Sequence, residues 1–302
     1  MNSSSRWKKE NRQDEIQRKE TMRHKTNTFS SLARRIFRAG LLCFCLFAAT
    51  ETISAQAKGD EVQEAQRNAK AIRSYKAFGA GFCKVQDTYL SPEEYKGTEL
   101  RYLSHTIRER EGKKWASLII NEGYGAIGNS RSENGATLSG AYHFMYGRMR
   151  AFSLFDGKMK VWAGAQGELT LGMIYNTRNG NNPAQAIANI DVGGLVRAEY
   201  PVKKVTISYE AACPLFGVTF SPNYGQSYYE IFNEGNYDHN VVPTTIFSVP
   251  SLRHTITAEL QLGKTKCIFG IYGDYRQQQV NNLKRHLYTS GVMIGVVRNV
   301  FR

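Results

Sequence analysis

The stretch Gln185–Tyr200, QAIANIDVGGLVRAEY, alternates between two kinds of residue. Its even-numbered positions carry no charge. Its odd-numbered positions carry the polar residues Gln185, Asn189, Asp191, Arg197 and Glu199. Successive side chains of a β-strand point to opposite faces, so the pattern predicts a long strand with one apolar and one polar face.

Stretches of the same texture recur from Tyr75 to the end of the chain and predict an all-β fold of about ten antiparallel strands. Their predicted ranges are 75–90, 98–109, 114–128, 136–152, 158–174, 185–200, 203–218, 251–262, 265–280 and 284–301. The segment 219–250 is too long for a simple hairpin turn. If it carries an extra hairpin, the alternative is a barrel of twelve strands.

Alternation alone fits two architectures, because a soluble lipocalin-like barrel has the same period with its apolar face inside. Three features favour a transmembrane barrel. Alanine and glycine fill much of the apolar phase, and the chain ends on a strand with Phe301 next to last. Predicted connections also alternate between short turns, such as 155–157 and 263–264, and longer polar loops, such as 91–97 and 219–250. Short periplasmic turns and long outer loops are typical of bacterial outer-membrane barrels.

Residues 1–57 have the composition of a leader. A basic segment after Met22 precedes a 12-residue apolar run, Ala39–Thr50, and then Ala55-Gln56-Ala57. This order is typical of a cleaved secretory signal, and the apolar run is shorter than the roughly 20 residues of a spanning helix. We therefore expect a signal peptide at 22–57, an over-extended start at 1–21, a polar periplasmic segment at 58–74 and a barrel at 75–302 in the bacterial outer membrane. A lipoprotein is the less favoured alternative.

The charge balance argues for lipid and against nucleic acid as a partner. The whole chain has 40 Lys and Arg against 26 Asp and Glu, a net charge of +14. Removing residues 1–57 takes away 11 basic and 5 acidic residues, which leaves 29 against 21, or +8. This excess is spread along the chain, whereas nucleic-acid binding needs a concentrated stripe. We expect contact with outer-membrane lipid and lipopolysaccharide, and with the barrel assembly machinery through the last strand.

Two stretches resemble a family of uncharacterised outer-membrane barrel proteins of Gram-negative bacteria, a domain of unknown function. One is Gly172–Gln185, GMIYNTRNGNNPAQ, and the other is Phe220–Glu230, FSPNYGQSYYE, with Asn236–Asn240, NYDHN, after it. The resemblance covers about residues 75–302. It implies the barrel fold and supplies no activity or catalytic residue.

The polar phase of the strands predicts a charged lumen. A barrel of about ten strands has a small interior that side chains largely fill. We expect a network of ion pairs and hydrogen bonds there, because unpaired buried charges are costly. A narrow polar conduit and a catalytic carboxylate pair are the alternatives. The predicted lumen residues are Glu168, Asp191, Arg197, Glu199, Glu210, Arg253, Glu259, Asp274 and Arg276, with His143 beside them.

The long outer loop 219–250 is the predicted functional segment, because its aromatic residues argue against disorder. The expected binding residues are Tyr224, Tyr228, Tyr229, Phe232 and Tyr237, with Asn181 and Asn182 of a neighbouring loop. Asp238 and His239 are candidates for an acid–base pair, with Ser221 as a nucleophile. Adjacent strand residues point in opposite directions, so that pair requires a backbone turn. The alternative is a Tyr- and Asn-rich structural loop.

We expect no cofactor and no metal site. The amides around Gly180 suit tight turns, and Ca²⁺ binding by the amide oxygens of Asn176, Asn179, Asn181 and Asn182 together with Asp238 is a weaker alternative. The three cysteines after the leader, Cys83, Cys213 and Cys267, fall on predicted strands that are not neighbours, so we expect three free thiols.

Function is the open question. The first hypothesis is a non-enzymatic outer-membrane barrel whose outer loops bind or shield something at the cell surface. The second is a hydrolase of lipid or peptide that uses the 219–250 loop, and the third is a narrow solute channel. Fold alone does not separate them.

Overall fold

The computed structural model describes residues 70–110, 114–132 and 135–301. The predicted leader at 1–57 and most of the predicted periplasmic segment lie outside these residues.

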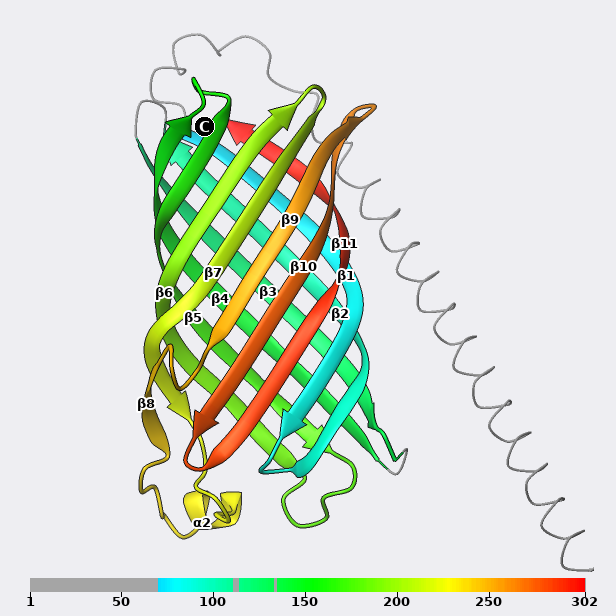
Figure 1. Cartoon of the computed structure of the whole chain (residues 1–302), viewed down its shortest axis with the longest axis vertical. Helices are drawn as coiled ribbons and strands as arrows, with labels where there is room; N and C mark the ends of the chain where they lie inside the picture. Colours follow the sequence, from blue (N-terminus) through cyan, green and yellow to red (C-terminus); the bar gives the residue numbers. More distant parts are fainter. Residues whose placement is uncertain (1–69, 111–113, 133–134, 302) are drawn as a thin grey trace, which may run out of the picture. The chain divides into compact units, whose positions relative to one another are not determined.

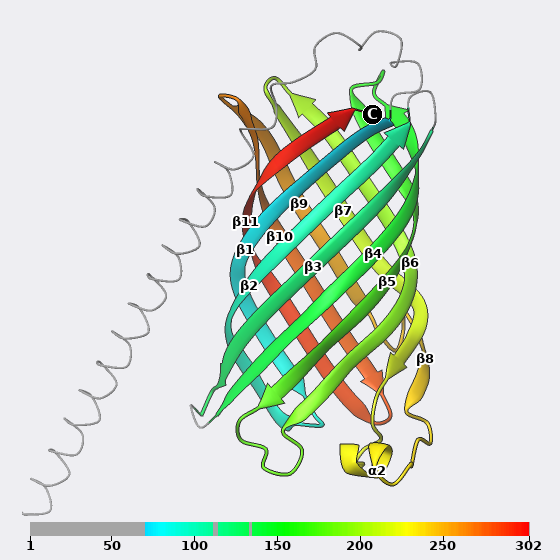
Figure 2. The same cartoon turned by 180° about the vertical axis from the view of Figure 1, so that it is seen from behind.

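The described residues form one antiparallel sheet that closes into a barrel (Figures 1 and 2). The strands are β1 (Lys70–Asp87), β2 (Ser91–Arg110), β3 (Trp115–Ser130), β4 (Ala136–Leu154), β5 (Met159–Asn176), β6 (Ala184–Val202), β7 (Val205–Phe220), β8 (Val241–Thr245), β9 (Ser251–Leu262), β10 (Thr265–Val280) and β11 (Leu283–Phe301). Each barrel strand pairs with its neighbours in the chain, β1 pairs with β11, and β7 pairs with both β6 and β9. The predicted fold of ten barrel strands is confirmed.

The short strand β8 adds no member to the barrel. It pairs with the last residues of β7, Phe216–Phe220, on the same edge where β9 pairs with the first part of β7, Val205–Ala212. Between β7 and β8 the chain forms the short helix α2 (Tyr228–Phe232). In Figure 1 both elements lie at one end of the barrel, opposite the marked C-terminus. The alternative of twelve strands is therefore wrong, because the segment 219–250 forms a helix and one short strand outside the barrel and adds no hairpin to it.

The two ends of the barrel differ in their connections. One end carries the start of β1, the end of β11 and the turns at 155–158, 203–204 and 263–264. We call it the periplasmic end, following the orientation of outer-membrane barrels. The other, outer end carries the longer loop at 177–183 and the cap. Positive φ values of 52° and 55° at Phe155 and Asp156, with 83° at Gly157, allow the turn between β4 and β5 to reverse the chain tightly.

Two predicted boundaries were wrong. β1 begins at Lys70, five residues before the predicted start at Tyr75. Residues 91–97, expected to be an outer loop, begin β2, and the turn before them is only 88–90. Pro92 is tolerated because β3 pairs with β2 only from Tyr95 onward, so Pro92 lies on a free edge where no ladder hydrogen bond is lost.

The faces of β6 follow the predicted alternation. Ile187, Asp191 and Arg197 are buried in the lumen, whereas Ile190 and Val196 are 63% and 46% exposed on the outer wall. Large apolar side chains are exposed all along the barrel wall, as a lipid-facing surface requires. The lumen also holds apolar clusters, the larger of which includes Leu118, Met145 and Trp162. The interior is thus a packed mixture of apolar and charged side chains.

No helix in the described part of the chain is long and apolar enough to span a bilayer. Cys83, Cys213 and Cys267 lie on β1, β7 and β10 and are free thiols, as predicted.

Candidate functional site

A central group of ion pairs crosses the lumen. Arg101 on β2 bonds Glu99 at 3.1 Å and also Glu122 on β3, and it lies 3.6 Å from Asp274 on β10. Arg253 on β9 pairs with the second oxygen of Glu122. All five side chains are at least nine-tenths buried, so each charge depends on these partners for its stabilisation.

The central group continues toward β5. Arg276 bonds Asp274 at 2.9 Å and Glu168 at 2.6 Å, which links β10 to β5 across the lumen. His143 on β4 lies 3.2 Å from the same Glu168 oxygen and 2.9 Å from the Thr170 hydroxyl. Four carboxylates and one imidazole therefore lie around three guanidinium groups.

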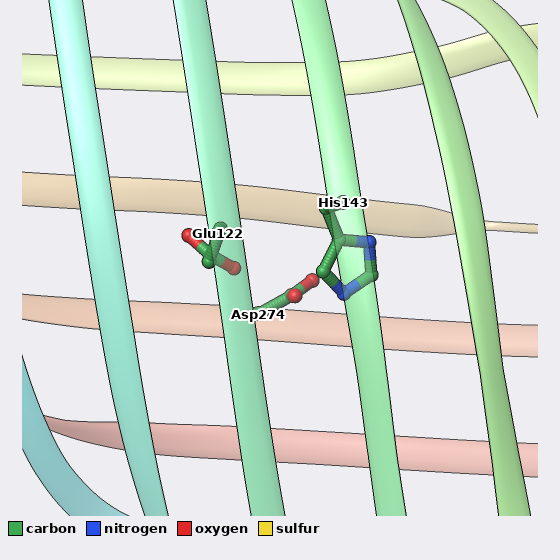
Figure 3. A group of neighbouring side chains, drawn as sticks. All are labelled: Glu122, His143 and Asp274. Atoms are coloured by element: carbon green, nitrogen blue, oxygen red, sulfur yellow. The ribbon is translucent and has the colours of Figure 1, made fainter.

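Glu122, His143 and Asp274 place ligand atoms within 4.8 Å of one another, which is the spacing of a metal site (Figure 3). The imidazole Nε2 of His143 is buried and has no hydrogen-bond partner. The two carboxylates, however, already hold Arg101, Arg253 and Arg276. A divalent cation would meet three positive charges at this point, so the group has the chemistry of an ion-pair lattice and does not fit a metal.

A second group lies nearer the periplasmic end. Arg197 bonds Glu199 at 2.7 Å and Glu210 at 2.9 Å, and the Glu210 carboxylate also accepts from His105 Nε2 at 2.9 Å. Arg73 on β1 then connects Glu199 on β6 with Glu259 on β9, and Lys266 completes the group at 2.8 Å from Glu259. These contacts join β1, β2, β6, β7, β9 and β10.

The structure places all nine predicted lumen residues on the inner face, and eight of them make ion pairs with described partners. Asp191 is the exception, since it is buried without an ion-pair partner among those residues. It lines a cavity of about 30 Å³ together with His143, Arg276 and Arg285. That volume holds about two water molecules, so the lumen is filled at this level.

Sequence reasoning missed Glu99, Arg101, His105 and Glu122, which are central to the lattice. The signal was present on β2, where Glu99, Arg101 and His105 occupy the same strand phase. It was hidden because apolar Leu103 and Ile107 share that inward phase.

The outer cap, residues 221–250, is fixed by its own polar side chains. A capping box begins α2: the Ser227 hydroxyl accepts from the backbone N–H of Glu230, whose carboxylate accepts from the N–H of Ser227. Asn240 donates to the Gln226 side chain at 2.7 Å and to the backbone carbonyl of Ser221 at 3.1 Å. Asn281, in the turn between β10 and β11, donates to the carbonyls of Ser221 and His239 and ties the cap to the barrel.

Tyr228 is the anchor of the cap. Its hydroxyl accepts from the N–H of Ala186 at 2.7 Å and donates to the Gln185 side chain at 3.1 Å, both at the start of β6. Its ring contacts Tyr89, Phe220 and Phe232. Burial raises the pKa of Tyr228 above its ordinary value, which keeps the hydroxyl protonated as a donor. Tyr228, predicted as a binding residue, therefore attaches the cap to β6.

The other aromatic residues of the cap face outward. Tyr224, Tyr229, Phe232 and Tyr237 are 74%, 63%, 61% and 63% exposed. Asn181 and Asn182 donate their backbone N–H groups to the side-chain oxygen of Asn179, in the turn chemistry expected for that loop. The side-chain oxygen of Asn176 accepts from the N–H of Arg178, so the side-chain oxygens of Asn176 and Asn179 both take part in hydrogen bonds within the loop.

Asp238 and His239 meet, because His239 adopts a positive φ of 56° that turns the backbone. Asp238 Oδ1 lies 2.7 Å from His239 Nδ1, and both side chains are more than three-quarters exposed. Ser221 is buried and its hydroxyl donates to the carbonyl of Pro222. No described serine bonds to His239, so the structure brings together two of the three proposed catalytic residues and leaves the nucleophile apart.

Solved structures with a similar strand arrangement were compared with this chain. The outer membrane protease OmpT from Escherichia coli is 7% identical, with a TM-score of 0.43, over 78% of this chain and 97% of that one. The translocator domain of the autotransporter NalP from Neisseria meningitidis is 8% identical, with a TM-score of 0.30, over 85% and 95%. The transport unit of the autotransporter AIDA-I from Escherichia coli is 7% identical, with a TM-score of 0.32, over 83% and 97%. None of these similarities assigns an activity to this chain.

No curated protein matches the sequence. One family model matches residues 40–302, which is most of the chain and includes the whole barrel. The resemblance drawn from Gly172–Gln185 and Phe220–Glu230 is thereby confirmed, and the chain belongs to the family described as a protein of unknown function, DUF3316.

Proposed function

We propose that this protein is an integral outer-membrane barrel that acts as a non-enzymatic binding protein through its outer cap. The observation that carries the proposal is the rigid presentation of Tyr224, Tyr229, Phe232 and Tyr237, more than half exposed on a cap whose backbone is tied by side chains. Exposed tyrosines on an ordered surface supply large contact area at low entropic cost, which is why they dominate many recognition surfaces.

The lumen supports the same proposal by its content. Two ion-pair groups and two apolar clusters occupy it, and the cavity beside Asp191 holds about two waters. Solute passage would require the buried pairs of Arg101, Arg253 and Arg276 to separate, at a cost of several kcal/mol for each stranded charge. A filled lumen therefore favours a structural scaffold over a channel.

A hydrolase is the second candidate, favoured by the 2.7 Å contact between Asp238 and His239. A carboxylate that orients an imidazole is the arrangement of a general base. Both groups are exposed at the surface, and no hydroxyl of the described residues is hydrogen-bonded to the His239 ring. The dyad alone is more consistent with a local contact of the cap.

The test uses the purified protein in lipid nanodiscs with arrays of extracellular proteins and polysaccharides as probes. We expect saturable binding that is lost when Tyr224, Tyr229 and Tyr237 are changed together to Ser, and kept when the same three are changed to Phe. Phospholipase and peptidase assays with and without Ca²⁺ run in parallel on wild type and His239→Ala. Cleavage by the wild type that His239→Ala abolishes, by about 10²–10⁴-fold, would replace the binding proposal with the hydrolase.

A further inference from the structure

Charges are divided unequally between the two faces of the barrel wall. On the described strands the carboxylates lie in the inward phase, with Glu94 as the exception. The outward phase carries basic residues on four neighbouring or near-neighbouring strands, β11, β1, β2 and β4, while β3 between β2 and β4 has none. These residues are Lys76, Lys84, Lys96, Arg108, Arg148, Arg150, Lys284 and Arg298. A wall with outward cations and almost no outward anions attracts anionic groups in the surrounding lipid.

Two of these outward residues, Arg108 and Arg148, form a cluster with Ser117 near the periplasmic end. In the strand register Arg108 on β2 lies opposite Ser117 on β3, and Ser117 lies opposite Arg148 on β4. Both arginines are exposed, and the residues beside them in the chain, Ile107 and Met149, are buried in the lumen. Since neighbouring strands are about 4.8 Å apart, the two arginine Cα atoms are roughly 10 Å apart, with a small hydroxyl side chain between them.

Aromatic rings lie beside this cluster. Trp115, the first residue of β3, is 51% exposed and lies opposite Arg150 in the register. The guanidinium of Arg148 lies 5.9 Å from the Trp115 ring centroid, and that of Arg150 lies 5.7 Å from the Phe152 ring. Tryptophan is enriched where a barrel wall crosses the lipid headgroup region. The cluster of Arg108, Ser117 and Arg148 is therefore expected at the level of the lipid headgroups.

None of these three arginines has a carboxylate partner among the described residues, in contrast to Arg101, Arg197, Arg253 and Arg276 of the lumen. The planar guanidinium fork matches phosphate, and two forks on either side of a serine hydroxyl can hold one phosphate from three directions. Toward the outer end, the next outward side chains are Ile119, Tyr146 and Phe144, an apolar and aromatic surface on which acyl chains pack.

We propose that Arg108, Ser117 and Arg148 bind the phosphate of an anionic glycerophospholipid in the periplasm-facing leaflet, with Trp115 and Arg150 completing the site. The periplasmic position selects this source over lipopolysaccharide, which occupies the opposite leaflet. The site depends on the orientation of the barrel in the membrane and is independent of what the outer cap binds.

The experiment is native mass spectrometry of the detergent-purified barrel titrated with phosphatidylglycerol, phosphatidylcholine or lipopolysaccharide. We expect wild type to prefer phosphatidylglycerol to phosphatidylcholine, and the double variant Arg108→Gln/Arg148→Gln to lose about tenfold or more in affinity for it. Lys84→Gln/Lys96→Gln is the matched control, since it removes the same charge from the outward wall near the outer end, and we expect a change of less than about twofold.

The variant Arg108→Lys/Arg148→Lys separates a built site from bulk attraction, because it keeps the charge and removes the guanidinium forks. We expect it to fall between wild type and the glutamine pair. Equal losses in the Arg108/Arg148 and Lys84/Lys96 pairs, or no preference for phosphatidylglycerol, would overturn the site. Arginine-dependent binding of lipopolysaccharide in place of phosphatidylglycerol would overturn the assigned lipid. Heat-modifiable mobility on gels checks that each variant is folded.

Discussion

Replacing Glu122 with Gln removes the charge on which the central lattice depends most. The carboxylate is 1% exposed and gives one oxygen to Arg101 and the other to Arg253. Arg101 keeps Glu99 and Asp274 after the change, whereas Arg253 keeps only the sulfur of Met145 among its described contacts. One buried guanidinium is therefore left without a carboxylate in direct contact with it.

Breaking a buried ion pair by removing one partner costs about 3–5 kcal/mol. We expect Glu122→Gln to lie near the lower bound, about 3 kcal/mol, because the amide keeps one acceptor oxygen and Arg101 keeps two carboxylates. Glu94→Gln is the matched control: it breaks a pair with Lys96 that is exposed on the outer wall, and such pairs contribute about 0–1 kcal/mol.

The assay is equilibrium folding into lipid vesicles against urea, followed by tryptophan fluorescence and by heat-modifiable mobility on gels. Adding Arg253→Met to Glu122→Gln removes the stranded charge, so the double variant should recover at least half of the loss. If Glu122→Gln cost no more than Glu94→Gln, the lumen would be wet enough to solvate Arg253 by itself. The description of the lumen as a filled lattice would then be wrong.

Three further results are expected. Val192→Lys, on the lipid-facing side of β6, should destabilise the barrel by about 2–4 kcal/mol, whereas Asn189→Lys should cost less because it lines the cavity beside Asp191; equal costs in urea titrations would refute the assignment of faces. Tyr228→Phe removes the hydroxyl that ties the cap to β6 and should speed proteolytic cleavage within 221–250, while Tyr224→Phe, at a 74% exposed ring, should not. The mature chain should begin near Lys58 and sediment with outer membranes, and recovery in the soluble periplasm would contradict this localisation.

The alternation of side chains predicted most of the barrel, because most strands separate lipid-facing from lumen-facing residues. The predicted ranges 251–262 and 265–280 coincide with β9 and β10. β9 shows why: Leu252 and Ile256 face lipid while Arg253 and Thr255 face the lumen, and His254 is the one polar residue in the lipid-facing phase. Where one face of a strand is almost entirely apolar and the other polar, an assignment shifted by one residue would place polar residues on the lipid side, and the sequence alone rules it out.

The pattern was weaker on β2 and β3, where each face carries both kinds of residue. On β3, apolar Leu118 and Ile120 point into the lumen in the same phase as Glu122, while Ser117 and Asn121 lie on the outer wall. Alternation of polarity then carries little information, because the lumen needs apolar packing as well as ion pairs. The outward polar groups satisfy one another locally, as Tyr142 does by donating to Asn121 at 2.6 Å.

The partners within the lattice could not be read from the sequence. Arg73 reaches Glu199 and Glu259, which are 126 and 186 residues away, and only closure of the barrel brings them together. The contact between Asp238 and His239 depends on a positive φ at a residue other than glycine, which no local pattern indicated. Residue type and strand phase thus predicted which side chains enter the lumen, while their pairing follows from the register of all ten strands.

The lattice also explains how that register is specified. A slip of one residue between two strands exchanges their faces and would move the inward charges of β6, Asp191, Arg197 and Glu199, to the lipid wall. A charge at mid-bilayer costs about 2–4 kcal/mol for a basic residue, and each displaced side chain would also strand a partner such as Arg73 in the lumen. A register slip would carry no such free-energy cost if the lumen were apolar, because apolar side chains are as stable against lipid as inside the barrel. The same reasoning applies to the outward face: apart from Glu94, which pairs with Lys96, the charges there are basic, and basic side chains near the ends of the strands can be neutralised by lipid phosphates.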